Sequence, residues 1–480
     1  MNLRALLLTI LAATTLTQAP AFLPAQNTPK SGKDTLEEDA FNIGLQAYIY
    51  GFPLVLTEVS REEMLANPAI RVNQFYHFPG LATPAMKSAV SANTDTLMSV
   101  AWLDFSNGPL LLNIPAMHGR YWVIEFNDFY TNSFAYAGLR TTGSDEQYYL
   151  LAGPDWKDTG EVGMKVIRCP ANVVFLVGRV FVAGERDLAE AQNLQHGISL
   201  TSFGPAASLN PRGADVLPDS FHADFAAELT PPEIVAQMDT PTFFAAMTRL
   251  MQLYPPPPQD EAAVKEFARV GIDLNPGFDP KRLDAATLRG LTRAVDAAIP
   301  FLAAAQPKLG GRTVNGWWTP PDAGEFGTNY LLRAYMALNF IWPNVAAEAV
   351  YPMTSVDGGG RSLDGAHRYV LHFAKGGTPP VDAFWSVTMF NPKRALVENP
   401  IHRYALGSRS EGLQYNPDGS LDIFIQADPP RGHESNWLPA PAGRFLLTMR
   451  LYIPKPPILN GTYAIPAVQC TDCSGPGSKP

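Results

Sequence analysis

The sequence predicts a mainly β protein with a helical connector, an α+β class with two antiparallel β-sandwich or jelly-roll-like domains. Short apolar runs recur in both halves of the chain and are separated by Gly, Asn, Asp and Pro, as in antiparallel strands joined by turns. The middle of the chain is instead Ala-rich and helical in period. An aromatic content of 11% and 44 prolines also favour short strands and turns.

The N-terminus has the pattern of a secretory signal peptide. Residues 1–4 carry one positive charge, residues 5–16 are apolar, and Ala19-Pro20-Ala21 and Leu23-Pro24-Ala25 are small-residue cleavage sites. The apolar run is too short for a permanent membrane anchor. We expect a signal peptide over 1–25, a disordered linker over 26–34, and export to the periplasm or the medium. An uncleaved amphipathic N-terminus is the alternative.

The N-terminal β domain is expected over residues 35–228. A capping box, Thr35 to Glu38, predicts the start of a helix, and Pro53 is expected to end or kink it. Strands are expected over 96–105, 110–114, 121–130, 148–152 and 173–182, with a loop from 200 to 228.

A helical connecting region is expected over residues 229–350, with helices near 262–272, 283–305 and 330–350. The C-terminal β domain follows over 351–467. Its clearest strands are 368–373, 384–390, 421–426 and 445–453, and Asn416-Pro-Asp-Gly419 predicts a tight turn. Residues 468–480 are expected to be a flexible tail.

The cysteines are Cys169, Cys470 and Cys473. The last two form a Cys-x-x-Cys motif between Gln469 and a Gly/Ser/Pro-rich end, without the helix N-terminus that a thioredoxin-like site needs. We expect a tail disulfide or no function for this motif. A metal site formed by these two cysteines lacks its other ligands in the local sequence.

The composition and motifs of the chain limit the classes of partner and cofactor that it is expected to bind. The net charge is −9 with no basic run, so no nucleic-acid partner is indicated. No further apolar stretch is long enough for an integral membrane span. The sequence contains no Gly-rich phosphate loop and no dinucleotide fingerprint, so no nucleotide cofactor is expected. It also contains no Gly-x-Ser-x-Gly motif and no His-Glu-x-x-His motif, which are signatures of two classes of hydrolase. Other cofactors, metal dependence and homo-oligomer formation stay open.

Long sequence phrases in the N-terminal half resemble the exported bacterial family called domain of unknown function 1254. They include Ala47-Tyr-Ile-Tyr-Gly-Phe-Pro53, Asn93-Thr-Asp-Thr96, Asp128-Phe-Tyr-Thr-Asn132 and Gly178-Arg179. Phrases in the C-terminal half resemble its usual companion, domain of unknown function 1214. They include Arg368-Tyr-Val-Leu-His-Phe373, Asn399-Pro-Ile-His-Arg-Tyr404 and Glu434-Ser-Asn-Trp-Leu-Pro-Ala-Pro441. The resemblance implies export and a β-rich two-domain architecture, but no mechanism.

Polar residues of the C-terminal domain predict one candidate site. Strand alternation puts Arg368 and His372 on one face, and two Pro-rich loops carry the other candidates. His372 or Glu434 would act as general base, and Arg403 would stabilise developing negative charge. The substrate-binding candidates here are Arg368, Trp437 and Tyr404. The structural alternatives are a solvated strand histidine and a tryptophan that closes the end of the sandwich.

The N-terminal domain offers two more candidate substrate-binding residues, Asp128 and Tyr130. Alternation puts them on the same face as Arg120 and Trp122, so an Arg–Asp pair could orient a polar substrate or be structural. A nearby polar group, Asn93, Asp95 and Thr96, has turn capping as its simpler interpretation.

Two functions of different classes fit this sequence. One is an exported hydrolase that acts on a small or oligomeric extracellular substrate. The other is a non-catalytic envelope protein that binds a ligand or assembles into oligomers. The hydrolase hypothesis requires at least three of the C-terminal polar residues to converge in one concave pocket.

Overall fold

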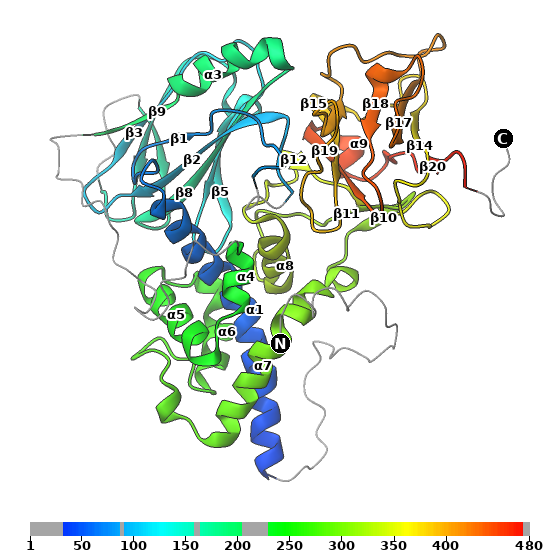
Figure 1. The fold of residues 1–480 in the computed structure, drawn as a ribbon. Helices are drawn as coiled ribbons and strands as arrows, with labels where there is room; N and C mark the ends of the chain where they lie inside the picture. Colours follow the sequence, from blue (N-terminus) through cyan, green and yellow to red (C-terminus); the bar gives the residue numbers. More distant parts are fainter. Residues whose placement is uncertain (1–31, 87–90, 158–163, 204–228, 474–480) are drawn as a thin grey trace.

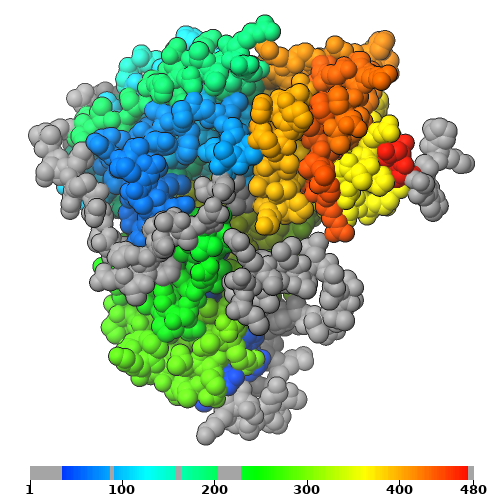
Figure 2. All heavy atoms as spheres, viewed as in Figure 1, coloured from blue at the N-terminus to red at the C-terminus, as the bar shows by residue number. Residues whose placement is uncertain are grey.

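The computed structural model describes residues 32–86, 91–157, 164–203 and 229–473. The expected signal peptide, nearly all of the linker and most of the 200–228 loop lie outside these residues. Two β-sandwiches lie side by side, and a helical unit packs below them (Figures 1 and 2). The two-sandwich, α+β fold class predicted from the sequence is therefore confirmed.

The N-terminal sandwich consists of a five-stranded and a four-stranded sheet. The first has the order β1-β2-β8-β4-β5 and the second β7-β6-β3-β9. The strands are β1 (Tyr76–His77), β2 (Thr96–Asp104), β3 (Leu110–Ile114), β4 (Trp122–Asn127), β5 (Ser133–Gly138), β6 (Gln147–Ala152), β7 (Lys165–Arg168), β8 (Val173–Phe181) and β9 (Ser199–Ser202). Two helices, α2 (Leu139–Thr142) and α3 (Leu188–Gly197), flank them.

Period-two alternation gives the five-stranded sheet two different faces. Leu176 of β8 and Trp122 and Ile124 of β4 enter the core between the two sheets, as expected. Val177 and Trp102 point the other way and pack against helices. The outer face of this sheet is thus covered rather than exposed to solvent, which allows it to line an internal site.

The helical unit is built around α1 (Gly32–Ala66) and α7 (Ala285–Ala303), which form its most extensive helix pair. The other helices are α4 (Pro231–Ala236), α5 (Thr240–Leu253), α6 (Glu261–Ala268) and α8 (Tyr330–Phe340). Helix α1 precedes the first strand in sequence but packs with the connector helices, so the helical unit is formed from two separate segments.

Two parts of the expectation for α1 were wrong, namely Thr35 as its N-cap and an end at Pro53. The helix starts at Gly32, so Thr35 lies inside it and is not its N-cap. The helix also continues through Pro53 to Ala66. Pro53 removes one backbone hydrogen bond. Burial of the neighbouring Phe52, Leu54 and Val55, each 0% exposed, favours the continuous helix because tertiary packing overrides local propensity.

Helix α8 is shorter than expected. It ends at Phe340 instead of continuing toward Val350, because Ile341 and Trp342 have positive φ angles of 36° and 39°. Pro343 follows, and a proline disfavours helical geometry in the residue before it. The resulting turn directs Trp342 against Trp102 and Phe175 of the five-stranded sheet.

The C-terminal sandwich pairs a sheet of order β10-β11-β13-β19-β15-β16, with β12 also on β19, and a second sheet of order β18-β17-β14-β20. Its strands are β10 (Arg312–Val314), β11 (Trp317–Thr319), β12 (Ala349–Val350), β13 (Met353–Thr354), β14 (Tyr369–Phe373), β15 (Val381–Phe390), β16 (Ala405–Gly407), β17 (Leu421–Gln426), β18 (Trp437–Pro439), β19 (Leu446–Pro454) and β20 (Val468–Cys470). Helix α9 (Pro456–Leu459) follows β19.

Two segments differ from the expected boundaries. Strands β10 and β11 come from the connector, yet they extend the C-terminal sheet. Residues 468–470, expected in the tail, form β20, which pairs with β14, and Cys470 and Cys473 form the disulfide that was one of the two expected outcomes. Among the helices of the described ranges, none is long and apolar enough to cross a bilayer.

Candidate functional site: the cavity between the sandwiches

A cavity of about 450 Å³ lies where the two sandwiches meet the helical unit. This volume is in the range of pockets that bind small organic molecules. Its walls come from the outer face of the five-stranded sheet, the end of α1, the turn after α8, and strand β19 of the C-terminal domain. Both β domains therefore contribute to one site.

Most of the wall is apolar. Strands β2 and β8 contribute alternate residues of the outer face, and the helical unit contributes the turn at Trp342. The apolar side chains include Phe78, Met98, Val100, Phe175, Val177, Ile341 and Trp342. Such a surface favours the non-polar part of a ligand, because burying it removes apolar area from water.

One group of polar side chains interrupts this wall. Arg179 of β8, Tyr351, and Thr448, Arg450 and Tyr452 of β19 all line the cavity. On β19 the polar residues are two positions apart, so they share the face that points away from the sandwich core. Leu447, Met449 and Leu451 lie on the opposite face, inside that core.

Arg179 is held by an ion pair. Its Nη1 donates to Oε2 of Glu125, which is 0% exposed, at 2.8 Å. Burial alone would lower the pKa of Arg179, but the charge of Glu125, the neighbouring Tyr351 and Tyr452, and the hydrogen bond to Glu125 together outweigh burial and hold this pKa above its ordinary value. The guanidinium therefore stays charged at the cavity wall.

Arg450 has neutral partners. Its Nη2 donates to the carbonyls of Ser91 and Ala92 at 2.8 and 2.9 Å, and its Nη1 donates to Thr388. Within the described ranges no carboxylate lies within 4.0 Å of it. Burial raises the pKa of nearby Asp95, which favours the uncharged acid. The positive charge of Arg450 is thus only weakly compensated.

The two tyrosines add hydrogen-bond donors. Tyr351 accepts from Asn344 at 2.6 Å, and Tyr452 accepts from Asn93 at 2.7 Å. Burial raises the pKa of both phenols, so they stay protonated. Because each oxygen already accepts a bond, its O–H proton is available for a ligand.

Two further donors have no partner among the described residues. These are Oγ1 of Thr448 and Nε1 of Trp342, and both residues line the cavity. Thr448 is 1% exposed and Trp342 6%. A buried polar group without a partner costs free energy, so its presence in a native fold requires an explanation. A ligand that accepts hydrogen bonds would supply one.

The predicted catalytic residues lie outside this cavity. His372 is half-exposed on the outer face of β14, and its Nδ1 lies 2.6 Å from Oδ1 of Asp422. Glu434 is exposed. Arg403 does approach Glu434 and Trp437, but its Nη1 donates to their backbone carbonyls, both at 2.8 Å, and not to the carboxylate.

The predicted substrate-binding residues of the C-terminal domain also have local partners. Arg368 is exposed, and its Nε lies 3.4 Å from Asp472. Trp437 is buried and donates to the carbonyl of Gln426, and Tyr404 donates to Glu398. None of these residues lines the cavity. Their roles in substrate binding, like those of the three catalytic candidates, stay untested predictions.

In the N-terminal domain the expected Arg–Asp pair does not form between Arg120 and Asp128. Arg120 instead makes a bidentate ion pair with Asp187. Asp128 accepts from the backbone N–H groups of Tyr130 and Asn132 at 2.9 and 2.8 Å, which closes the turn after β4. Tyr130 is buried and donates to the carbonyl of Tyr254. Neither Asp128 nor Tyr130 lines the cavity.

These polar cavity residues were not among the predicted site residues, although Asn93, interpreted as a turn cap, also lines the cavity. One signal in the sequence could have indicated them. Thr448, Arg450 and Tyr452 alternate with Leu447, Met449 and Leu451 in a single strand. Because the outer face of a two-sheet sandwich normally meets solvent, that alternation alone does not reveal a cavity.

Comparison with known proteins supports both domains. Residues 72–202 match the family model described as protein of unknown function (DUF1254), and residues 348–456 match the one described as protein of unknown function (DUF1214). The two-domain resemblance expected from the sequence is confirmed. No curated protein matches the chain.

Two solved structures are similar to this chain. The VPA0106 protein from Vibrio parahaemolyticus is 21% identical, with a TM-score of 0.67 over 90% of this chain and 100% of that one. An uncharacterised Burkholderia cenocepacia protein is 12% identical, with a TM-score of 0.42 over 91% and 95% of the two chains. At this identity the Vibrio structure supports the fold alone.

Proposed function

We propose that this chain, which joins a DUF1254 domain to a DUF1214 domain, binds a small amphipathic anion in the cavity between its two sandwiches. The observation that carries the proposal is the chemistry of the polar group in the wall. Its two guanidinium groups, two phenols and Thr448 can all donate hydrogen bonds, while the rest of the wall is mostly apolar. This combination fits a carboxylate or similar head group on a hydrocarbon or aromatic body.

Isothermal titration calorimetry with three probes tests this proposal. Octanoate carries both a carboxylate and an apolar chain, octanol lacks the charge, and acetate lacks the chain. We expect octanoate to bind at least about tenfold more tightly than either analogue, because each analogue loses one class of contact. Failure of octanoate to bind, or equal binding of octanoate and octanol, would overturn the proposal.

Matched variants locate the binding site. Val177→Phe places a larger side chain in the cavity wall and should abolish binding without loss of the native circular dichroism spectrum. His372→Ala and Glu434→Ala change exposed residues outside the cavity and should leave binding unchanged. If the latter two variants lost binding and Val177→Phe retained it, the ligand would belong to the C-terminal candidate site instead.

Hydrolysis in the same cavity is a second candidate. Glu63 lines the cavity, and burial raises the pKa of its carboxyl group, which suits a general acid–base. The test is release of the acid from a p-nitrophenyl ester of octanoic acid. Turnover by the wild type that Glu63→Gln removes, while octanoate still binds, would support this candidate.

Export to the periplasm or medium stays part of the proposal and is tested by N-terminal sequencing of the protein recovered outside the cytoplasm.

A further inference from the structure

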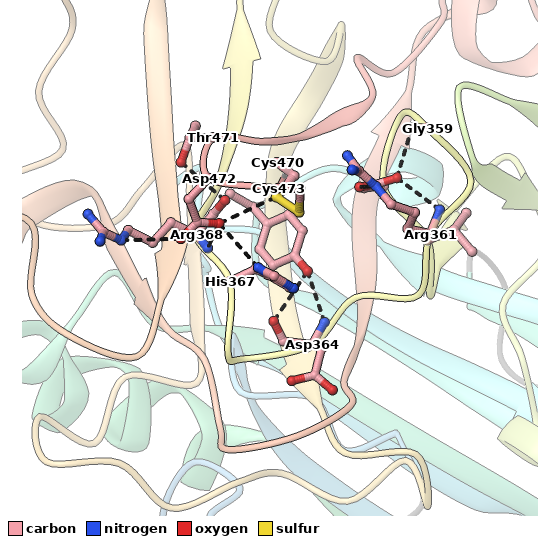
Figure 3. A network of polar contacts seen from close by, with 12 residues as sticks. Gly359, Arg361, Asp364, His367, Arg368, Cys470, Thr471, Asp472 and Cys473 are labelled. Carbon is pink, nitrogen blue, oxygen red and sulfur yellow. Dashed lines mark hydrogen bonds and ion pairs between the residues drawn. A yellow bond between two sulfur atoms is a disulfide. The ribbon is translucent and has the colours of Figure 1, made fainter. Parts of the chain in front are cut away.

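Four potential metal ligands meet at the end of the C-terminal sandwich. One ligand atom from each of His367, Cys470, Asp472 and Cys473 lies within 4.8 Å of all the others. Figure 3 shows His367 and Asp472 joined by a dashed line beside the Cys470–Cys473 disulfide. This cluster is distinct from the cavity between the sandwiches, since none of its members lines that cavity.

Strand pairing brings these residues together. Strand β20 is antiparallel to β14, with Cys470 opposite Tyr369. The N–H of Thr471 donates to the carbonyl of Arg368 at 2.8 Å and extends this pairing by one residue. His367, just before β14, therefore faces the turn that contains Asp472 and Cys473. The register of the sheet thus brings His367, which is distant in sequence, to the segment that contains Cys470, Asp472 and Cys473.

Asp472 is oriented toward the cluster. Its Oδ1 accepts from the backbone N–H of Arg368 at 3.1 Å and lies 3.3 Å from Nδ1 of His367 and 3.5 Å from Sγ of Cys470. Its Oδ2 lies 3.4 Å from Nε of Arg368. One carboxylate oxygen thus points toward the candidate ligands, and the other is held by a cation.

We propose that the thiols of Cys470 and Cys473, once reduced, bind one zinc-class divalent cation together with His367 and Asp472. Two thiolates, an imidazole and a carboxylate are ligand types that zinc accepts in a tetrahedral site. Zn–S bonds of about 2.3 Å and Zn–N bonds of about 2.0 Å separate tetrahedral ligands by about 3.3 to 3.8 Å. Small movements within the 4.8 Å cluster satisfy that geometry.

The Cys470–Cys473 disulfide must be reduced before a metal ion can bind, because sulfur atoms in a disulfide are not thiolate ligands. A dithiol reductant transfers two electrons and two protons to the disulfide and becomes a cyclic disulfide, which leaves two cysteine thiols. Binding of the cation then releases these two thiol protons to water. The site has a charge of −1, from +2 for the metal, −2 for the thiolates and −1 for Asp472, and Arg368 balances it. The cluster is therefore a redox-dependent metal site.

Cobalt(II) is the direct probe, because thiolate coordination produces an intense charge-transfer absorption. The mature full chain would be reduced, freed of reductant without oxygen, and titrated with cobalt and then zinc. We expect one cobalt per reduced chain, displacement by zinc, and no binding by the oxidised chain. The Cys470→Ser/Cys473→Ser variant should not bind. The variant Cys169→Ala should bind normally, because that thiol is buried elsewhere in the N-terminal core.

Two single variants test the other ligands. His367→Ala and Asp472→Asn should each weaken cobalt binding by about tenfold or more, since the effect of losing a ligand should at least match that of losing an outer-shell partner. Arg361→Ala is the matched control, because it removes an exposed side chain of the same region that pairs with Asp357. Unchanged affinity in His367→Ala, or one cobalt shared by two chains, would overturn the proposal.

Discussion

Arg179 donates to Glu125 across 2.8 Å from the neighbouring strands β8 and β4, and this ion pair lies under the cavity that both sandwiches line. Glu125 also accepts from Ser133 at 2.7 Å and from Tyr136 at 3.4 Å. The carboxylate thus satisfies a buried polar network while it fixes one guanidinium at the cavity wall. The stability of the fold and the proposed ligand binding therefore involve the same pair.

Removing the guanidinium should therefore destabilise the fold. In Arg179→Met, Glu125 becomes a buried carboxylate without its ion-pair partner, and we expect the free energy of unfolding to fall by about 3 to 5 kcal/mol. The double variant Arg179→Met/Glu125→Leu should recover much of this loss, because no uncompensated charge remains. Urea unfolding measures both. Equal losses in the single and double variants would contradict the role assigned to the charge.

The unpartnered hydroxyl of Thr448 leads to a second prediction. Thr448→Val removes a buried donor that has no partner among the described residues, so we expect unfolding to cost about 1 kcal/mol more. Octanoate affinity should fall about three- to tenfold, the equivalent of one hydrogen bond. Thermal unfolding measures the expected gain in stability, and isothermal titration calorimetry measures the expected loss of octanoate affinity.

Thr388 is the matched control for that variant. It is the register partner of Thr448 in the neighbouring strand and is equally buried, but its hydroxyl accepts a bond from Arg450. Thr388→Val should therefore lower stability, because Arg450 loses an acceptor. If both valine variants changed stability in the same direction, the distinction between the two hydroxyl groups would be wrong.

The strands could be predicted from the sequence because alternation and turn residues are local signals. Leu110–Ile114 and Leu421–Gln426 have the expected bounds, and His372 is exposed while Leu371 is buried, as alternation predicted. Helix ends were less predictable, because the packing of α1 overrides the effect of Pro53.

The candidate sites could not be predicted because they depend on contacts distant in sequence. Arg179 and Arg450 line one cavity only after the two sandwiches dock against each other. His367 reaches Cys470 only through the pairing of β14 with β20. Each residue alone has an ordinary structural interpretation, so local motifs favoured the exposed loops around Arg403 and Glu434 instead.

The contact between α1 and α7 gives a third prediction. A Cβ atom on Gly290 would meet the backbone carbonyl of Glu37 and the Cβ of Ala40, so the two helices would have to separate. Gly290→Ala should destabilise the protein by about 1 to 3 kcal/mol, although alanine is the better helix former. At Gly51 the three nearest atoms to the added Cβ all belong to the flexible side chain of Met247, so Gly51→Ala should change stability by less than about 1 kcal/mol. Urea unfolding compares the two, and a larger loss for Gly51→Ala would refute the explanation.

Burial of Asp95 gives a fourth prediction, on pH. Desolvation raises the pKa of this carboxyl above its ordinary 3.8, against the opposing effects of Arg450 and Ser386. The folded state therefore binds the proton more tightly than the unfolded state does. The contribution of Asp95 to stability is complete below about pH 3.8 and is lost as pH rises through the folded pKa. Asparagine does not titrate, so Asp95→Asn lacks this pH-dependent loss of stability. The free energy of unfolding of the wild type minus that of the variant should therefore decrease as pH rises.

Asp418 provides a control of opposite sign. The hydroxyl and the backbone N–H of Ser420 lower the pKa of its exposed carboxyl, so its contribution is present above pH 3.8 and is lost as pH falls. For Asp418→Asn the same difference should increase as pH rises. Urea unfolding of the three proteins at a series of pH values measures both slopes. Parallel curves for the wild type and Asp95→Asn would mean that burial does not raise the pKa of Asp95 and would contradict this prediction.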